Sequence, residues 1–311
     1  MKKIFIAFAA LATIAACNKA EVLETPEGDA IQFGNAFVDN VTKAAADPSY
    51  GASAVALDHF NVYGTVGGVN IFNGNAVTKG GADYGAAWTC AGQDQYWVAG
   101  ASYIFDAVVD ATAVTTDANT GLPTSLNYLA STQKDMLYKR VTTTGKPASG
   151  LVQFTFTHLL SKVKFTVENE TPSTATNYQY TITDIKITNT ITEGNYAVSL
   201  SEWTTESTGD HTIADMTVAS AATEECATEV LLVPGASVGV SFNVNVQVKN
   251  GVSSQWETLS TIPVAKTAVA TLDANTAYNF LVTVGLGDNI KFTAMQMTNW
   301  DNAADTPVSI Q

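Results

Sequence analysis

Residues 238–248 read Val-Gly-Val-Ser-Phe-Asn-Val-Asn-Val-Gln-Val, with an apolar side chain at every second position. Because successive side chains of a β-strand point to opposite faces of a sheet, this alternation predicts a strand with one buried and one solvated face. The same period of two returns at residues 278–284 and 154–160. No long window has the helical period of about 3.6 residues. The chain is therefore predicted to be all-β.

Turn-forming residues separate the predicted strands at short intervals. Gly-Gly or Asn-Gly pairs stand at residues 67–68, 73–74, 80–81 and 250–251. Short alternating strands with frequent turns are typical of a β-sandwich. The apolar phase shifts by one residue between Leu160 and Val163, which predicts a bulge or a tight reversal around residues 159–162.

The polar, proline-containing segment 168–177 is the best candidate for a linker. It divides the chain into two halves of similar size, which we predict to be domains of residues 31–170 and 171–311. Each half lies within the usual size of a domain, about 100–200 residues, and can bury a core of its own.

The start of the chain predicts export and lipidation. Two lysines precede an apolar run that ends in Ala-Ala, which is the layout of a signal peptide of residues 1–16. The run is shorter than the roughly 20 residues that span a membrane. Cys17 follows directly and resembles the acylated cysteine in the lipobox of bacterial lipoproteins; an ordinary signal peptide with a chance cysteine is the alternative. Residues 17–30 are polar and acidic and are predicted to be a lipidated tether.

The charge of the chain excludes one class of partner. The whole chain has 15 basic and 29 acidic residues. Removal of residues 1–16 takes away two lysines and no acid, which leaves 13 basic against 29 acidic residues, or −16. Nucleic acid repels such a chain, so nucleic acid is not expected as a partner.

No catalytic constellation is found in the sequence. The histidines and cysteines lack the spacing of a metal site, so we expect no metal, no cofactor and no enzymatic activity. His158 shares the apolar face of its strand and is interpreted as a core residue rather than a functional one. Cys90 and Cys226 either pair in an oxidising compartment or stay as two buried thiols, and the second interpretation is favoured.

Several stretches resemble the fimbrillin-like proteins of Bacteroides-type bacteria, which are subunits of the type V pilus. The more distinctive stretches are His158-Leu-Leu-Ser-Lys-Val163 and Asn299-Trp300 near the end. The remaining matching stretches lie at residues 31–33, 40–44, 57–64, 96–105, 135–138, 231–234, 272–280 and 290–292. Together they span nearly all of the mature chain, and the lipobox agrees with them.

The resemblance implies two tandem transthyretin-like (Greek-key) β-sandwiches and a role as a structural pilus subunit that supports adhesion. In the family, a lipidated precursor reaches the outer membrane and a trypsin-like protease cuts after a basic residue near the first strand. The C-terminal segment of another subunit then fills the opened groove by strand addition. The implied partners are other pilus subunits, the protease, the membrane through the lipid on Cys17, and a host or bacterial surface ligand. The resemblance implies that the precursor is anchored to the outer membrane and that the assembled subunit is part of the cell-surface pilus.

Carried onto this chain, the resemblance places the displaced first strand at residues 31–40 and the donor strand within residues 290–311. The groove-filling side chains of the first strand would be Ile31, Phe33, Phe37 and Val38. The donor side chains would be Ile290, Phe292, Ala294, Met295, Met297 and Trp300. An ordinary last strand that packs on its own domain is the alternative for this tail.

One position departs from the family pattern. Members that polymerise typically carry arginine at the cut, whereas this chain has a single arginine, Arg140, and has Lys43 at the matching position. Lysine can enter a carboxylate-bearing pocket but lacks the guanidinium fork of arginine. Either Lys43 is the cleavage site, or the subunit keeps its first strand and lipid as an anchor or accessory protein.

The aromatic residues leave a second function open. One short stretch is rich in aromatic residues, which either fill a core or form a platform for sugar. These residues are Trp88, Tyr96, Trp97 and Tyr103. The alternative function is therefore an outer-membrane lipoprotein that binds carbohydrate. A coplanar, exposed pair among Trp88, Trp97, Trp203 and Trp256 would favour sugar binding, and buried indoles would favour the pilus subunit.

Overall fold

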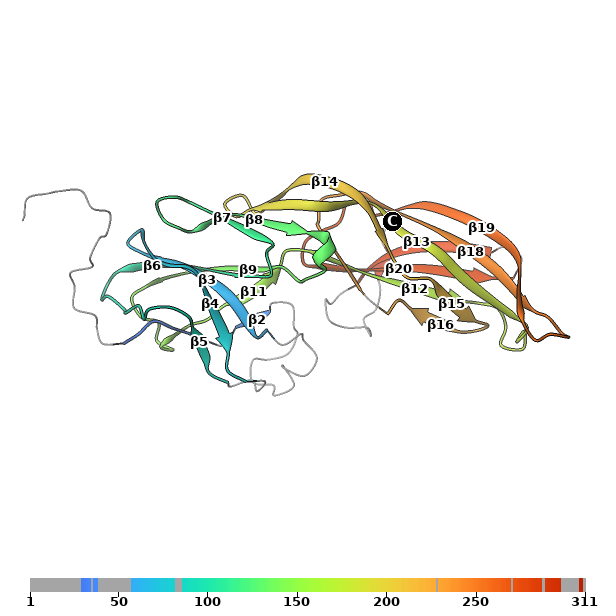
Figure 1. The fold of residues 1–311 in the computed structure, drawn as a ribbon, viewed down its shortest axis with the longest axis horizontal. Helices are drawn as coiled ribbons and strands as arrows, with labels where there is room; N and C mark the ends of the chain where they lie inside the picture. The colour runs from blue at the N-terminus through green and yellow to red at the C-terminus, as the bar shows by residue number, and fades with distance from the viewer. Residues whose placement is uncertain are drawn as a thin grey trace, which may run out of the picture.

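The computed structural model describes residues 29–34, 36–38, 57–81, 86–227, 229–269, 271–286, 289–297 and 308–309. Within these residues the regular structure is β-strand apart from one 3-10 turn, η2 (Ala130–Thr132). The prediction of an all-β fold is confirmed. The molecule is elongated, with the first half at one end and the second half at the other (Figure 1).

Among the described residues, eleven strands precede the expected phase shift. They are β1 (Gln32–Phe33), β2 (Phe37–Val38), β3 (His59–Val66), β4 (Val69–Lys79), β5 (Trp88–Cys90), β6 (Ser102–Val109), β7 (Ala113–Thr116), β8 (Pro123–Leu129), β9 (Leu137–Thr144), β10 (Leu151–Val152) and β11 (Thr155–His158). One sheet has the order β2-β11-β9-β6-β3-β4-β5, and β1 pairs with β10 beside it. An apolar core rich in phenylalanine lies between them.

The second half contains the longer strands. They are β12 (Ser161–Asn169), β13 (Tyr178–Ala197), β14 (Glu202–Thr212), β15 (Met216–Ala219), β16 (Thr223–Glu225), β17 (Val230–Leu232), β18 (Val238–Lys249), β19 (Trp256–Val269), β20 (Thr276–Gly285), β21 (Asn289–Met297) and β22 (Val308–Ser309). One sheet has the order β16-β12-β20-β21-β22, with β17 also on β12. The other has the order β19-β18-β13-β8-β7, with β14 and β15 also on β13.

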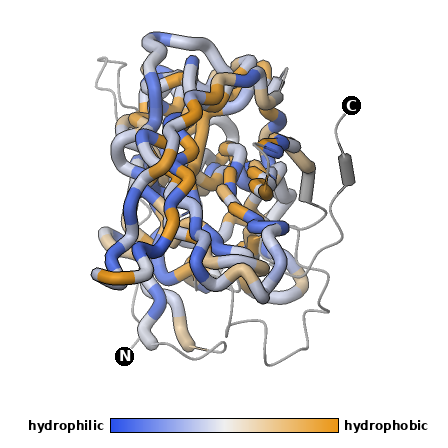
Figure 2. The backbone as a smooth tube through the Cα atoms, turned by 90° about the vertical axis from the view of Figure 1, so that its right-hand side faces the viewer, coloured by the Kyte–Doolittle hydropathy of each residue, from blue (hydrophilic) through white to orange (hydrophobic). Residues whose placement is uncertain are grey.

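The stretch with the clearest alternation forms β18, whose side chains alternate between buried and half-buried over most of its length. Phe242 and Val244 are almost fully buried in the core between the two sheets. Figure 2 shows the same alternation as hydrophobic and hydrophilic residues that follow one another along the strands. The alternation of apolar and polar residues therefore correctly predicted a strand with one buried face.

A third apolar cluster joins the two halves. It combines residues of β6 and β8 with residues of β13, and with Leu159 and Leu160 between β11 and β12. The break that the phase shift predicts thus lies between these two strands. The side-chain amide of Gln133 bonds both to the backbone oxygen of Leu231 at 3.1 Å and to its N–H at 2.9 Å. The Trp203 indole donates to the Leu159 carbonyl at 3.0 Å.

Strand pairing crosses the division that we expect at residue 170. Strand β12 precedes it but pairs in parallel with β20, from Ser161↔Thr276 to Asn169↔Val284. Strand β8 pairs with the end of β13. Strands β7, β8 and β12, which precede residue 170, therefore belong to the sheets that contain the strands of residues 171–311. Residue 170 as a domain boundary stays a prediction.

Candidate functional site

The first strand is held on both sides by other parts of the first half. Strand β1 pairs in parallel with β10, and β2 pairs in parallel with β11. On the other side, the Ile31 N–H donates to the Gln95 carbonyl at 2.7 Å and the Trp97 N–H donates to the Asp29 carbonyl at 3.2 Å. Residues 29–31 thus pair with residues 95–97, and residues 32–33 pair with β10.

Phe33 is the side chain that fixes this strand in the core. It is 4% exposed, and its ring lies 5.3 to 6.3 Å from four phenylalanine rings, mostly edge to face. These neighbours are Phe60, Phe72, Phe105 and Phe154. Ile31 is also buried, and Val38 packs half-buried against the same core. The first strand therefore buries much apolar area, although it makes few backbone hydrogen bonds to neighbouring strands.

An ion pair lies where the strand enters the fold. The Lys146 ammonium donates to a carboxylate oxygen of Asp29 at 2.6 Å. The Asp29 side chain is 60% exposed and that of Lys146 is 35% exposed. Solvent screens such a pair, so its contribution to stability is small, about 0–1 kcal/mol. Apolar burial rather than charge retains the first strand.

The candidate donor strand, β21, belongs to the other end of the molecule. It pairs antiparallel with β20 along its whole length, and β22 pairs with it at Met295 and Gln296. Ala294 is buried. Ile290 and Phe292 are only partly buried against the second core, where the Phe292 ring lies 5.8 Å from that of Phe280.

The structure does not describe every residue of the predicted sites. Cys17, Lys43 and Trp300 lie outside the described residues, and for Phe37 and Met297 the backbone alone is described. The described residues of the first strand and of β21 belong to different apolar cores of one chain. Cleavage, lipidation and strand exchange stay predictions.

The tryptophans do not form the platform that sugar binding would need. Trp97 is fully buried, Trp88 is half-buried beside Phe60, and Trp203 is half-buried in the junction. Trp256 is 37% exposed, with the Lys249 ammonium 5.9 Å from its ring centre. Of the four tryptophans that the structure describes, one is therefore exposed and no coplanar exposed pair exists.

Cys90 and Cys226, the two described cysteines, form no disulfide, and each is half-buried. Burial, followed by the charge of Asp94, raises the pKa of Cys90, which favours the unreactive thiol form. His158 is buried as predicted, and its Nδ1 lies 2.7 Å from a carboxylate oxygen of Asp135.

One buried polar cluster was not predicted from the sequence. Asp106 on β6 is completely buried, and Arg140 on β9 donates to both its oxygens from Nε and Nη2, each at 2.7 Å. The Tyr138 hydroxyl donates to the same carboxylate at 2.7 Å. Burial, followed by the charge of Asp106, raises the pKa of Tyr138, and the hydrogen bond to Asp106 raises that of Arg140. Asp106 and Arg140 are 34 positions apart in the sequence, and no local period signals their contact, because the pairing of β6 with β9 alone creates it.

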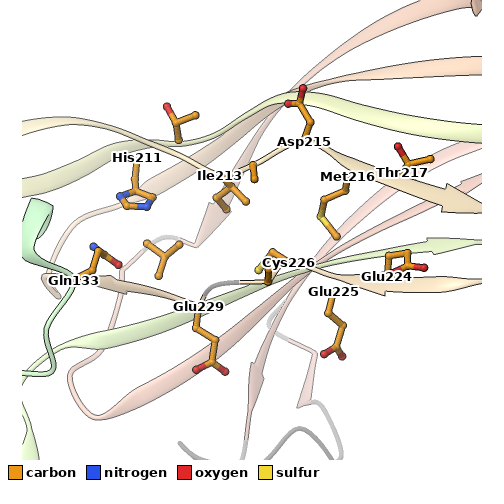
Figure 3. Close-up of a pocket in the computed structure, with 14 residues that line it drawn as sticks. Gln133, His211, Ile213, Asp215, Met216, Thr217, Glu224, Glu225, Cys226 and Glu229 are labelled. Atoms are coloured by element: carbon orange, nitrogen blue, oxygen red, sulfur yellow. The ribbon is translucent and has the colours of Figure 1, made fainter.

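A cavity of about 480 Å³ lies between β14–β15 and β16. In Figure 3, His211, Ile213 and Met216 point toward Cys226, whereas Glu225 and Glu229 point away. Those two glutamates pair with Lys164 and Lys162, at 2.6 and 3.1 Å. Burial lowers the pKa of His211. None of the predicted site residues lines this cavity.

The described residues offer neither a metal site nor a membrane-spanning helix. No group of three or more histidine, cysteine, aspartate or glutamate side chains in the described ranges is placed to hold a metal ion. No helix among the same residues is long and apolar enough to cross a membrane.

Comparison with known proteins identifies the relatives of this chain. A sequence profile described as fimbrillin-like matches residues 42–300. No curated protein matches the chain. A fimbrial protein from Bacteroides vulgatus has a similar fold, with a TM-score of 0.60 at 13% identity over 86% of this chain and 99% of that one. A candidate cell adhesion protein from Bacteroides uniformis gives a TM-score of 0.56 at 19% identity over 88% of this chain and 98% of that one.

Proposed function

The chain belongs to the fimbrillin-like family, and on that premise we propose that it is a structural subunit of a cell-surface pilus that supports adhesion. It is exported as a lipoprotein precursor, anchored to the outer membrane through Cys17, and assembled after a trypsin-like protease cuts at Lys43. The cut releases the first strand, and the C-terminal strand of another subunit replaces it by β-strand addition.

The burial of Phe33 is the observation that carries this proposal. Its ring contacts four phenylalanines, but the strand that bears it pairs with β10 at only two residues. Loss of the strand would leave those rings and Trp97 at the wall of an open apolar groove. Apolar area exposed to water costs about 25 cal/mol per Å², so an extended apolar segment would bind there favourably.

The position of Lys43 in the chain suits a release step. It follows β2, which ends at Val38, and precedes β3, which begins at His59. A cut after Lys43 therefore separates the lipidated cysteine and the complete first strand from both sandwich cores. After the cut, non-covalent contacts alone would retain the first strand.

The test is to add a trypsin-like protease to purified precursor. We expect a ladder of SDS-resistant oligomers on gels, because strands exchanged into a sandwich dissociate slowly. The variant Lys43→Gln should remain monomeric, since glutamine offers no cation to the protease. Lys134→Gln is the matched control, because the Lys134 side chain is 63% exposed in a loop of the first half, and it should assemble like the wild type.

Two results would contradict the proposal. One is a monomer that stays monomeric after clean removal of residues 1–43. The other is a ladder that persists when residues 290–311 are deleted, provided that circular dichroism shows the deleted protein to be folded.

The N-terminus of the assembled subunit provides a separate prediction. Mass spectrometry of pili should find Ala44 as the first residue, because cleavage discards everything before it. Subunits that still begin at acylated Cys17 would overturn the cleavage step and assign the chain to the anchor or accessory role.

A further inference from the structure

Strand β19 is the longest strand at the edge of a sheet among the described strands. It has 14 residues and pairs with β18 on one side, and no described strand pairs with its other side. In Figure 1 it runs along the outer side of the second half. A long, regular edge offers a row of free backbone N–H and C=O groups to a strand of another molecule. The residues of β19 therefore decide whether copies of this chain associate through it.

Pro263 lies near the middle of this edge. It is opposite Asn243 of β18, and proline has no backbone N–H to donate. Within a sheet, proline fits where that position faces away from the neighbouring strand. The missing N–H therefore belongs to the outer side of β19, where it leaves a gap in the row of donors that an incoming strand would need.

A β-bulge lies a few residues before the proline. The pairing with β18 skips Leu259, because Thr258 and Ser260 pair with consecutive residues of β18. The Leu259 side chain is 62% exposed. A bulge bends its strand and increases the local twist, so a regular strand from another copy cannot follow β19 past this residue.

A lysine on the core side of β19 forms the third interruption. Lys266 lies directly opposite Val240, which is 1% exposed in the second core. Opposite residues of neighbouring strands point to the same face of a sheet. The Lys266 side chain therefore starts on the core face, yet it is exposed at the edge. A strand added there would place its own core-facing side chains beside the lysine and take the ammonium group out of water, which costs free energy.

The other long edge strand of this sheet is interrupted as well. Among the described strands, β14 pairs with β13 alone, and register shifts break this pairing at three points. Each register shift changes the direction in which the backbone groups of β14 point. Both long edges of the sheet are therefore unsuited to continuous pairing with another strand.

We infer that Leu259, Pro263 and Lys266 together protect the edge of β19 from pairing with β19 of a second copy of this chain. These edge-protecting residues act in the folded, uncut chain, so the inference does not depend on cleavage. Under the proposed function, they confine strand pairing between copies to the groove of the first half.

The variant Pro263→Thr/Lys266→Val tests this inference in the uncut, full-length precursor. It restores the missing N–H and replaces the lysine by an apolar residue that favours strands. Sedimentation velocity should show the wild type as a monomer and the variant as a dimer whose fraction rises with concentration. Hydrogen exchange with mass spectrometry should show slower exchange of the amides of residues 257–267 in the dimer, because newly paired amides are protected.

Two further variants serve as controls. Pro147→Thr/Lys134→Val makes the same two changes in loops of the first half, and it should remain monomeric. Ala265→Pro, added to the test variant, should restore the monomer. Residue 265 follows residue 263 without a register shift, so its N–H faces the same outer side of the strand and is lost in the same way.

Several results would overturn the inference. They are a folded test variant that stays monomeric, a dimer in which residues 257–267 exchange as fast as in the monomer, a dimer that persists with Ala265→Pro, and association of the control variant. If circular dichroism shows the test variant to be unfolded, Lys266→Val alone replaces it, because this change alters no backbone group, and the same expectations apply. Failure here leaves the proposed function intact, because no protease takes part in the experiment.

Discussion

The variant Phe33→Ala is expected to lower the free energy of unfolding of the precursor by about 3–5 kcal/mol, because it leaves a cavity among four phenylalanine rings. For a chain of this size, the melting temperature should fall by about 10 °C. Scanning calorimetry of the uncut precursor measures the change. Phe33→Leu, which keeps most of the apolar volume, should cost much less.

The same variant separates the precursor from the assembled subunit. Under the proposed cleavage, Phe33 would leave with the first strand, so Phe33→Ala should not change the stability or final extent of the ladder. Phe72 stays in the groove wall, 5.3 Å from the Phe33 ring, so Phe72→Ala should weaken both precursor and ladder. Equal damage to the ladder by the two variants would show that Phe33 remains in the assembled subunit.

The sequence predicted those features of the fold that depend on local periodicity. The alternation in residues 238–248 predicted β18 and its buried face, and the phase shift predicted the break between β11 and β12. Pairing between distant segments was not predictable from it. The parallel pairing of β12 with β20 joins residues more than 100 positions apart, and no local pattern encodes such a partner.

The candidate site shows the same limit. Apolar alternation and the family resemblance together pointed to Ile31 and Phe33 as core-filling residues, and both are buried. The groove around them is built from β3, β4, β6 and the segment before β11, so its aromatic wall became visible only in the fold. Equally, the partial burial of Ile290 and Phe292 depends on their place at the edge of a sandwich rather than on their sequence.

The variant Arg140→Met is expected to lower the free energy of unfolding by about 3–5 kcal/mol, because it leaves the fully buried Asp106 carboxylate without its cation. Tyr138 would remain as a single hydroxyl donor to the carboxylate. Methionine keeps the apolar length of the arginine stem, so lost packing contributes little. Urea denaturation measures the change.

A double-mutant cycle assigns this cost to the ion pair. Asp106→Asn combined with Arg140→Met removes the uncompensated charge, so the double variant should be more stable than Arg140→Met alone. Additive losses would mean that the two side chains act independently, contrary to their bidentate contact. The same contact bears on the proposed processing. Because the chain's single arginine is bound to a buried carboxylate in the middle of a sheet, a trypsin-like protease that acted on the folded precursor would be expected to cut after a lysine, and Lys43 is the lysine proposed for this cut.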